Sequence, residues 1–357
     1  MKDIGVSGIM RVKNDADFIE ASVESCISAL DELIIVYNDC SDNSPEIIEK
    51  VRLKYPNKIR SYEYKEKVYS INLTKEEYEY ARSLPLDSSH LLCNYYNFAL
   101  SKATCKYAMK IDADQIYFTE KLKWWCDVYR GKKVKFGFVT ILGGLIWTYS
   151  RIVSKINFIS RRILPLMSLH KTDFFWNCYS NFVAHMIQKA KRPVSLSGVD
   201  VFKDKGWYVT VGLKNSINNI LPPYNGVGDH LIFKVGKDTY YRPDDCEFYN
   251  NLRSDSYTLI ERFEHAQGNP IPIGICWYHV NAMRNSVAPK VLAAKDKYPD
   301  YFVPINEFVN LDYNKDIEPM EDKQMVVHYQ NILFQFIHQY NAFDIKTYLN
   351  KLNNIGS

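Results

Sequence analysis

Apolar and polar residues alternate in blocks along the first third of the chain, and the period of the blocks switches between that of strands and that of helices. Short apolar, β-branched runs predict strands at Ile4–Met10, Leu33–Tyr37 and Ile59–Tyr64. Helical spacing predicts helices over Asp15–Leu30, from Ser44-Pro45 through Val51, and over Leu91–Ala103. This alternation is typical of a mostly parallel, doubly wound sheet with helices on both faces. Residues 65–90 interrupt it and are interpreted as an insertion.

The composition fits an ordinary globular protein. The chain has 357 residues, of which 46% are hydrophobic and 24% charged. The start lacks an apolar stretch of signal-peptide length, and no run of about 20 apolar residues would span a bilayer. Eight cysteines are scattered without a C-x-x-C pair, which suits a reducing compartment. We therefore expect a cytoplasmic protein.

Positive charge is concentrated in residues 121–205, where 16 Lys and Arg face four acidic residues, a local charge of +12. An anionic partner is indicated, but no nucleic-acid-binding motif accompanies the charge, so nucleic acid is not expected. Apolar residues recur at helical spacing through residues 143–164: Leu145, Tyr149, Ile152, Ile156, Ile159 and Ile163. Other positions are basic: Arg151, Lys155, Arg161 and Arg162. An interfacial membrane helix and a core-facing helix with a solvated basic side explain this pattern equally well.

Two carboxylates, Asp112 and Asp114, follow the apolar run in KYAMKIDADQIYF (106–118). Side chains two apart in an extended segment point the same way, so both are expected to converge at the carboxyl end of a strand. Ligands of doubly wound sheets bind at that edge. Adjacent carboxylates repel each other unless a cation lies between them, and a hard divalent ion that also contacts substrate phosphates is the usual solution.

Three segments, in order, resemble the nucleotide-binding half of family 2 glycosyltransferases, which have the Rossmann-like GT-A fold. They are IMRVKNDADFIEASVESC (9–26), ELIIVYNDCSDNSPEII (32–48) and CNYYNFALSKATCKYAMKIDADQIYF (93–118). The resemblance covers about residues 4–118. It implies a nucleotide-sugar donor, usually a UDP-sugar, and a bacterial surface-glycan setting. The positions that match the donor-binding motifs of the family are Asn14, Asp39, Ser41, Asp42, Asn97 and Asp112.

The same resemblance implies Mn²⁺ or Mg²⁺ held by Asp112 and Asp114, with a later histidine, here His279, completing the metal site. Two positions depart from the family pattern. Cys40 replaces the commoner glycine, and Gln115 follows the D-x-D where an acid is frequent. These departures leave the identity of the donor open.

The catalytic base has two rival positions. Asp244-Asp245 precedes a predicted helix, whose N-terminal dipole would keep a carboxylate ionised, and the order and spacing to His279 match the family. Asp245 is preferred over Asp244, which is interpreted as the helix cap. Asp229 is the alternative, in a predicted Gly-rich turn where Gly226 and Gly228 allow a ligand to approach the backbone.

These patterns predict three regions: residues 1–118 bind the nucleotide-sugar, 119–285 bind the acceptor and carry the base, and 286–357 form a C-terminal helical extension with periodic apolar residues over 325–352. The predicted function is an inverting, metal-dependent transfer to an oligosaccharide or lipid-linked glycan, with contact at the inner membrane face left open. Two alternatives remain, a sugar-1-phosphate nucleotidyltransferase and a non-catalytic membrane-surface scaffold. The first is disfavoured because the strand at Ile4–Met10 is not followed by a Gly-rich phosphate loop.

Overall fold

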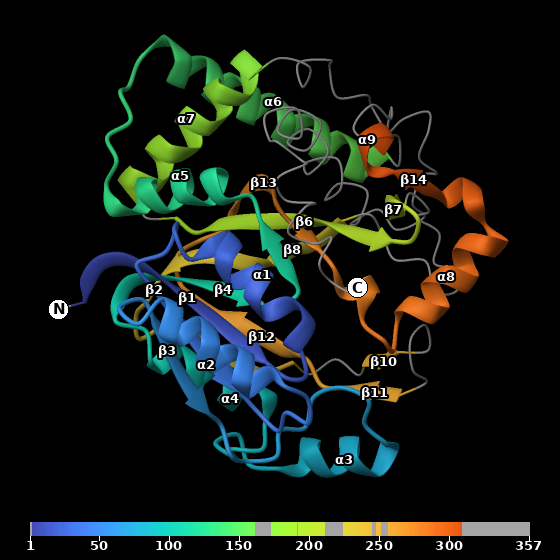
Figure 1. The fold of residues 1–357 in the computed structure, drawn as a ribbon. Coiled ribbons are helices and arrows are strands. Elements are labelled where there is room, and N and C mark those ends of the chain that lie inside the picture. The colour runs from blue at the N-terminus through green and yellow to red at the C-terminus, as the bar shows by residue number, and fades with distance from the viewer. Residues whose placement is uncertain are drawn as a thin grey trace. The chain divides into compact units, whose positions relative to one another are not determined.

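A computed structural model describes residues 2–160, 173–190, 192–210, 224–244, 248–250 and 256–308 (Figure 1). The described residues form two compact units. The first combines those of Met1–Asp114 and Ile232–Gly268, and the second those of Gln115–Leu231 and Asn269–Ile355. The first unit thus ends close to the predicted boundary at 118, but it also includes a later segment that the sequence placed with the second region.

The first unit is built on a parallel sheet in the order β3, β2, β1, β4. Its strands are β1 (Asp3–Val12), β2 (Glu32–Tyr37), β3 (Ile59–Glu63) and β4 (Cys105–Asp112). Residues 232–234 of β8 (Tyr224–Lys234) pair with β4 in the antiparallel direction. Three helices connect the parallel strands, namely α1 (Ala16–Cys26), α2 (Ser44–Lys54) and α4 (Leu92–Ser101). The predicted α/β class and these elements are confirmed.

Apolar content explains why the central strands form. Leu33, Ile34, Ile35 and Val36 of β2 are all fully buried, as expected for a strand covered on both faces. Helices α1 and α2 pack against each other (Figure 1). Gly8 of β1 is in the core, where an added Cβ would lie 2.6 Å from Leu30 Cδ1 and 2.8 Å from Ile111 Cδ1. This glycine therefore serves close packing.

The insertion between β3 and α4 contains α3 (Lys75–Ser83). Its start is a capping box: Glu77 N–H donates to the Thr74 hydroxyl, and Thr74 N–H donates to the Glu77 carboxylate. Two antiparallel pairs complete the first unit: β9 (Tyr240–Pro243) with β12 (Glu261–Glu264), and β10 (Phe248–Asn250) with β11 (Ser256–Thr258).

The helix predicted after Asp244-Asp245 is wrong, because this segment contains β10 and β11. Tyr257 of β11 exchanges two backbone hydrogen bonds of 3.0 Å with Leu73 of the insertion, a partner far away in sequence. Long-range pairing thus outweighs the local helical spacing. The Gly-rich turn predicted around Asp229 is also wrong, because Asp229 is within strand β8.

The second unit has its own sheet in the order β14, β7, β6, β13, β5. The strands are β5 (Gln115–Tyr117), β6 (Val194–Lys203), β7 (Trp207–Thr210), β13 (Ile271–His279) and β14 (Phe302–Pro304). Its helices are α5 (Thr119–Arg130), α6 (Phe138–Ser160), α7 (Asp173–Ala190), α8 (Ala288–Lys297) and the short α9 (Ile305–Phe308), with 3₁₀ turns at Asn281–Met283 and Pro299–Tyr301.

The region from 286 onward is not a purely helical extension. Within the described residues it includes strand β14, and α8 buries Val291 and Ala294 in one cluster with Phe202 and Phe302. This segment is therefore part of the core of the second unit. The helix predicted over 325–352 lies outside the described residues. Among the described helices, none is long and apolar enough to cross a membrane.

Candidate functional site

The turns after β1 and β2 share an unusual backbone conformation. Asn14 and Asp39 have φ values of 57° and 47°, in the left-handed region that residues other than glycine rarely adopt. The Asn14 side chain also accepts a hydrogen bond of 2.7 Å from Ser41 N–H, which ties the two turns together. Such conformations cluster at ligand sites, and two predicted donor-binding residues, Asn14 and Asp39, adopt them here.

Asp42 joins the starts of two helices. Its carboxylate accepts hydrogen bonds from Ala16 N–H at 3.1 Å and Ser44 N–H at 3.0 Å. Burial alone would raise the pKa of Asp42, but hydrogen bonds from Ser44 and Ala16 outweigh it and hold the pKa below its usual value. The carboxylate is therefore ionised at neutral pH and fixes the edge of the sheet from which Asp39 projects.

A cavity of about 420 Å³ opens beyond the ends of β2 and β3. Its lining is mostly polar and charged: Tyr37, Asp39, Cys40, Pro45, Glu63, Tyr64, Lys65 and Lys67. Asp39 accepts a 3.0 Å ion-pair hydrogen bond from Lys13. Burial raises the pKa of the Cys40 thiol, which is therefore a neutral wall of this cavity. The cavity offers tyrosine rings, carboxylates and ammonium groups to a polar ligand.

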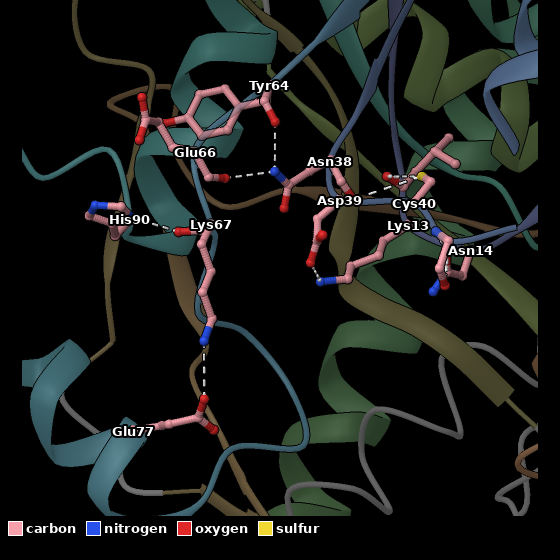
Figure 2. Close-up of polar contacts among 12 residues, drawn as sticks. Lys13, Asn14, Asn38, Asp39, Cys40, Tyr64, Glu66, Lys67, Glu77 and His90 are labelled. Carbon is pink, nitrogen blue, oxygen red and sulfur yellow. Dashed lines mark hydrogen bonds and ion pairs between the residues drawn. The ribbon is translucent and has the colours of Figure 1, made fainter.

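One wall of the cavity is held in place by Asn38, which is not among the residues predicted from the sequence. Its buried side-chain amide donates to the carbonyls of Tyr64 and Glu66, each at 2.7 Å (Figure 2). The wall continues into the insertion, because Lys67 Nζ lies 3.2 Å from the Glu77 carboxylate and the Lys67 carbonyl lies 2.8 Å from His90 Nδ1. Asn38 thus links the end of β2 to residues 64–67.

The end of β4 is a charged centre of a different kind. Parallel register pairs Arg11 with Asp112, and Arg11 Nη2 lies 3.3 Å from Asp112 Oδ1. Lys110 Nζ lies 3.9 Å from the other carboxylate oxygen. The Arg11 guanidinium also stacks over the Tyr96 ring, 3.0 Å from its centroid. Both cationic side chains are nearly buried, so Asp112 is held between two fixed positive charges.

Asp112 and Asp114 are not on one continuous strand. Asp112 is the last residue of β4, Asp114 lies in the turn that follows, and β5 starts at Gln115. The Asp112 side chain is 32% exposed, whereas Asp114 is buried. Because the extended strand ends at Asp112, strand geometry does not determine where the Asp114 side chain points. The convergence of the two carboxylates therefore stays a prediction.

His279, the predicted third metal ligand, is buried in the second unit at the end of β13. Its Nδ1 contacts the Asp200 carboxylate on the neighbouring strand β6. Metal-binding histidines are commonly oriented by such a carboxylate. Further along β13, the Ile275 carbonyl accepts a hydrogen bond from buried Lys121, and burial lowers the pKa of Lys121 to about 8. Among the described residues, no three His, Cys, Asp or Glu side chains form a group that would hold a metal by themselves.

The remaining predicted residues have these positions. Asn97 binds the backbone of Tyr241 through both ends of its amide, at 2.7 and 2.8 Å, and so anchors β9. Asp244 follows β9, and its N–H donates to the Ile260 carbonyl. Asp245 lies outside the described residues, and the Asp229 side chain is not described either. Because the described residues after Asp244-Asp245 form strands and not a helix, no helix dipole would keep the Asp245 carboxylate ionised. One reason for preferring Asp245 as the base is therefore lost.

Residues 4–141 match the family described as "Beta-1,4-N-acetylgalactosaminyltransferase (CgtA)". This match covers β1 to β5, including the ends of β1, β2 and β4. Over these residues, the chain is therefore similar to a family of glycosyltransferases. No curated protein matches the chain.

Solved structures similar to this chain include S. aureus TarS 1–349 in complex with UDP-GlcNAc, with 14% identity over 96% of this chain and 92% of that one, at a TM-score of 0.36. Another is glucosyl-3-phosphoglycerate synthase from Mycobacterium tuberculosis in complex with Mn²⁺, UDP-glucose and glycerol 3-phosphate. It shares 16% identity over 32% of this chain at a TM-score of 0.20, and the match spans 35% of the synthase. Similarity this low assigns no substrate.

Several residues of the site were not predicted from the sequence. Arg11 lies beside Asp112 only because of the register between β1 and β4, and Asp200 meets His279 only because β6 and β13 are neighbours. Lys110 is two residues before Asp112 on the same strand, so the two side chains point to the same side. Asn38 directly follows the predicted strand Leu33–Tyr37, and Lys110 lies near the end of the apolar run before Asp112. Polar residues at or next to the ends of predicted parallel strands are therefore a signal that points to both.

Proposed function

We propose that this chain is a glycosyltransferase that moves a sugar from a UDP-sugar to an oligosaccharide or lipid-linked glycan in bacterial surface polysaccharide synthesis. The observation that carries the proposal is the polar cavity at the ends of β2 and β3, within the segment that matches a glycosyltransferase family. The description of that family favours an N-acetylhexosamine donor and a β linkage. Because such donors are α-linked and the product linkage would be β, transfer would proceed with inversion at the anomeric carbon. We propose that the reaction takes place in the cytoplasm.

In this proposal, Asp39 and its neighbours bind the nucleoside while the end of β4 holds the diphosphate. Lys13 keeps Asp39 at the rim of the cavity. Asn14 and Ser41 fix the turn against which the donor would lie. Tyr37 and Tyr64 provide aromatic faces, which suit a planar base.

The donor groups at the end of β4 fit a divalent cation, Mn²⁺ or Mg²⁺. Such ions are usually held by one or two carboxylates together with substrate phosphates. We propose Asp112 and Asp114 as its protein ligands, with Arg11 and Lys110 beside Asp112. When bound, the ion supplies positive charge to the departing diphosphate. His279 as a third ligand stays a proposal that is supported by its orienting contact with Asp200.

The base that accepts the proton of the acceptor hydroxyl is proposed to be one of Asp245, Asp244 and Asp229. It must lie on the side of the anomeric carbon opposite the diphosphate, so it must be separate from Asp112 and Asp114. Spacing to His279 still favours the Asp244-Asp245 pair. Removing a general base typically slows a reaction by roughly 10²–10⁴ fold.

The alternative of a nucleotidyltransferase is weakened by the structure. The glycine nearest the end of β1 is Gly8, and its missing side chain makes room for Leu30 and Ile111 in the core. It is therefore not part of a phosphate-binding loop. A non-catalytic scaffold would not need the charged cavity or the cations that flank Asp112.

The function is tested by incubating the purified chain with Mn²⁺ and a panel of nucleotide-sugars and measuring slow hydrolysis of the donor. UDP-N-acetylhexosamines should be consumed ahead of other donors. Nucleotide-sugar synthesis from sugar-1-phosphate and nucleoside triphosphate is measured in parallel. Activity in that second assay alone would contradict the proposal.

The base is tested with Asp245→Asn, Asp244→Asn and Asp229→Asn, once an acceptor is known. We expect one variant to lose transfer by roughly 10²–10⁴ fold while its donor affinity stays near that of the unmodified chain. If Asp229→Asn alone behaves in this way, strand β8 carries the base and the assignment to Asp245 is wrong. Near-normal transfer by all three variants would place the base elsewhere.

A further inference from the structure

Helix α6 has two apolar faces, and among the described residues only one of them is covered by a neighbouring element, α7. On the covered face, Ile146 is buried, and α6 approaches α7 so closely that a Cβ at Gly143 would lie 2.0 Å from the Cys178 carbonyl. On the other face, large apolar side chains project into solvent. Leu145 is 63% exposed, Ile152 is 52% exposed and Ile156 is 42% exposed.

Five of the exposed apolar side chains lie along one side of the helix. They are Phe138, Ile141, Leu145, Ile152 and Ile156, here called the α6 stripe. At 3.6 residues per turn, these five positions fall within an arc of about 60° around the helix axis. Scattered exposed apolar residues are normal on a protein surface, but an aligned row along one helix marks an interaction site.

The charged residues on α6 and in the segment just before it are all positive. Arg151 and Lys155 are exposed on the helix itself, and Lys132, Lys133 and Lys135 are exposed just before it. The sequence contains no acidic residue from Val128 to Ser160. A helix with an exposed apolar stripe and flanking cations has the character of one that lies in the interface of a membrane with anionic lipids.

We propose that the α6 stripe docks on an anionic lipid surface, with its apolar side chains at the acyl boundary and its cations among the headgroups. A protein partner would need matching acidic groups around an apolar groove, whereas anionic lipid supplies both features. The sequence left a core-facing helix equally open, and the exposure of Ile152 and Ile156 favours the lipid. This proposal is independent of the donor and acceptor.

The apolar part of the proposed membrane contact is tested by sedimenting the chain with vesicles of phosphatidylcholine, alone or mixed with phosphatidylglycerol. The test variant is Leu145→Asp. Its control is Leu53→Asp on α2, which replaces a leucine of equal exposure, 63%, outside the stripe. We expect Leu145→Asp to weaken binding to the mixed vesicles by roughly tenfold or more, and Leu53→Asp to leave it unchanged.

The electrostatic part of the proposed membrane contact is tested in the same sedimentation assay with a double variant, Arg151→Gln combined with Lys155→Gln. Each cation near an anionic surface contributes about a fivefold change in affinity, so the double variant should bind about 25-fold more weakly. The control combines Lys234→Gln with Lys237→Gln, two exposed lysines on the first unit. Binding of the unmodified chain should also weaken as salt is raised, because salt screens exposed charges.

Three results would overturn the proposal. They are equal binding to neutral and anionic vesicles, equal behaviour of Leu145→Asp and Leu53→Asp, and a vesicle-independent dimer that Leu145→Asp dissociates. The last result would assign the stripe to a second copy of the chain. Donor hydrolysis without vesicles should be the same in all these variants, so the outcome is separate from that of the proposed function.

Discussion

The ends of β2 and β4 each present an aspartate at the same edge of the parallel sheet, yet the two carboxylates have different surroundings. Asp39 is 67% exposed and pairs with one exposed lysine, Lys13. Asp112 pairs with Arg11 and Lys110, whose side chains are only 7% and 8% exposed. Water screens the attraction between Asp39 and Lys13. The attraction of Asp112 to Arg11 and Lys110 is screened less, because these two cationic side chains are nearly buried.

The contrast suggests a division of labour along one sheet edge. The β2 end is an open cavity whose shape depends on a loop, which suits recognition of a nucleoside. The β4 end is a preorganised set of charges, which suits stabilisation of charge that develops during a reaction. Three experiments distinguish the two ends.

The largest effect is expected on the rate of sugar transfer, when metal binding is lost. Metal binding should depend on the β4 end and not on the β2 end. Asp112→Asn and Asp114→Asn should each lower sugar transfer by roughly 10²–10³ fold, and excess EDTA should have the same effect on the unmodified chain. Asp39→Asn should bind donor more weakly but keep its response to Mn²⁺. The measurement is the initial rate during a Mn²⁺ titration. Full activity in EDTA, or in both β4 variants, would exclude the metal role.

How much of this contrast the sequence predicted depends on the range of the interactions involved. The buried run Leu33–Val36 identifies its strand, because burial follows from local apolar content. The pairing of Arg11 with Asp112 requires the register of two strands about a hundred residues apart, which no local pattern encodes. The helix predicted after Asp244 is wrong for a similar reason, because the strand at Tyr257 is stabilised by pairing with Leu73, which is far away in sequence.

A smaller effect is expected on stability, and it should be confined to the β4 end. Asp112→Asn leaves the nearly buried Arg11 without its counter-charge and should lower the free energy of unfolding by about 2 kcal/mol. Asp39→Asn breaks an exposed pair and should cost less than about 1 kcal/mol. Asparagine tolerates the left-handed backbone at position 39, so no strain is added there.

Urea midpoints of the two variants provide the measurement, with the slope of each transition checked for constancy. Equal midpoints would show that the charges around Asp112 are already hydrated. In that case the β4 end would not be preorganised, and the proposed contrast between the two strand ends would be lost.

The smallest effect concerns the wall of the β2 cavity, where Asn38 acts as a positioning residue. Asn38→Ala removes two hydrogen bonds to the carbonyls of Tyr64 and Glu66. The freed segment 64–67 would then have to be ordered when the donor binds, so part of the binding free energy is lost. We expect the KM for the donor to rise roughly fivefold to tenfold, with kcat nearly unchanged, because Asn38 does not reach the end of β4.

Asn94 offers a matched control for this change. Its side-chain amide also donates to two carbonyls, those of Leu86 and Ser88, at 2.7 and 2.9 Å, but these residues do not line the cavity. Asn94→Ala should therefore destabilise the insertion without changing the KM for the donor. If the two variants raise KM equally, the insertion as a whole shapes the site and Asn38 has no particular role. If Asn38→Ala lowers kcat instead, the β2 end takes part in the chemical step and the division between the two strand ends is wrong.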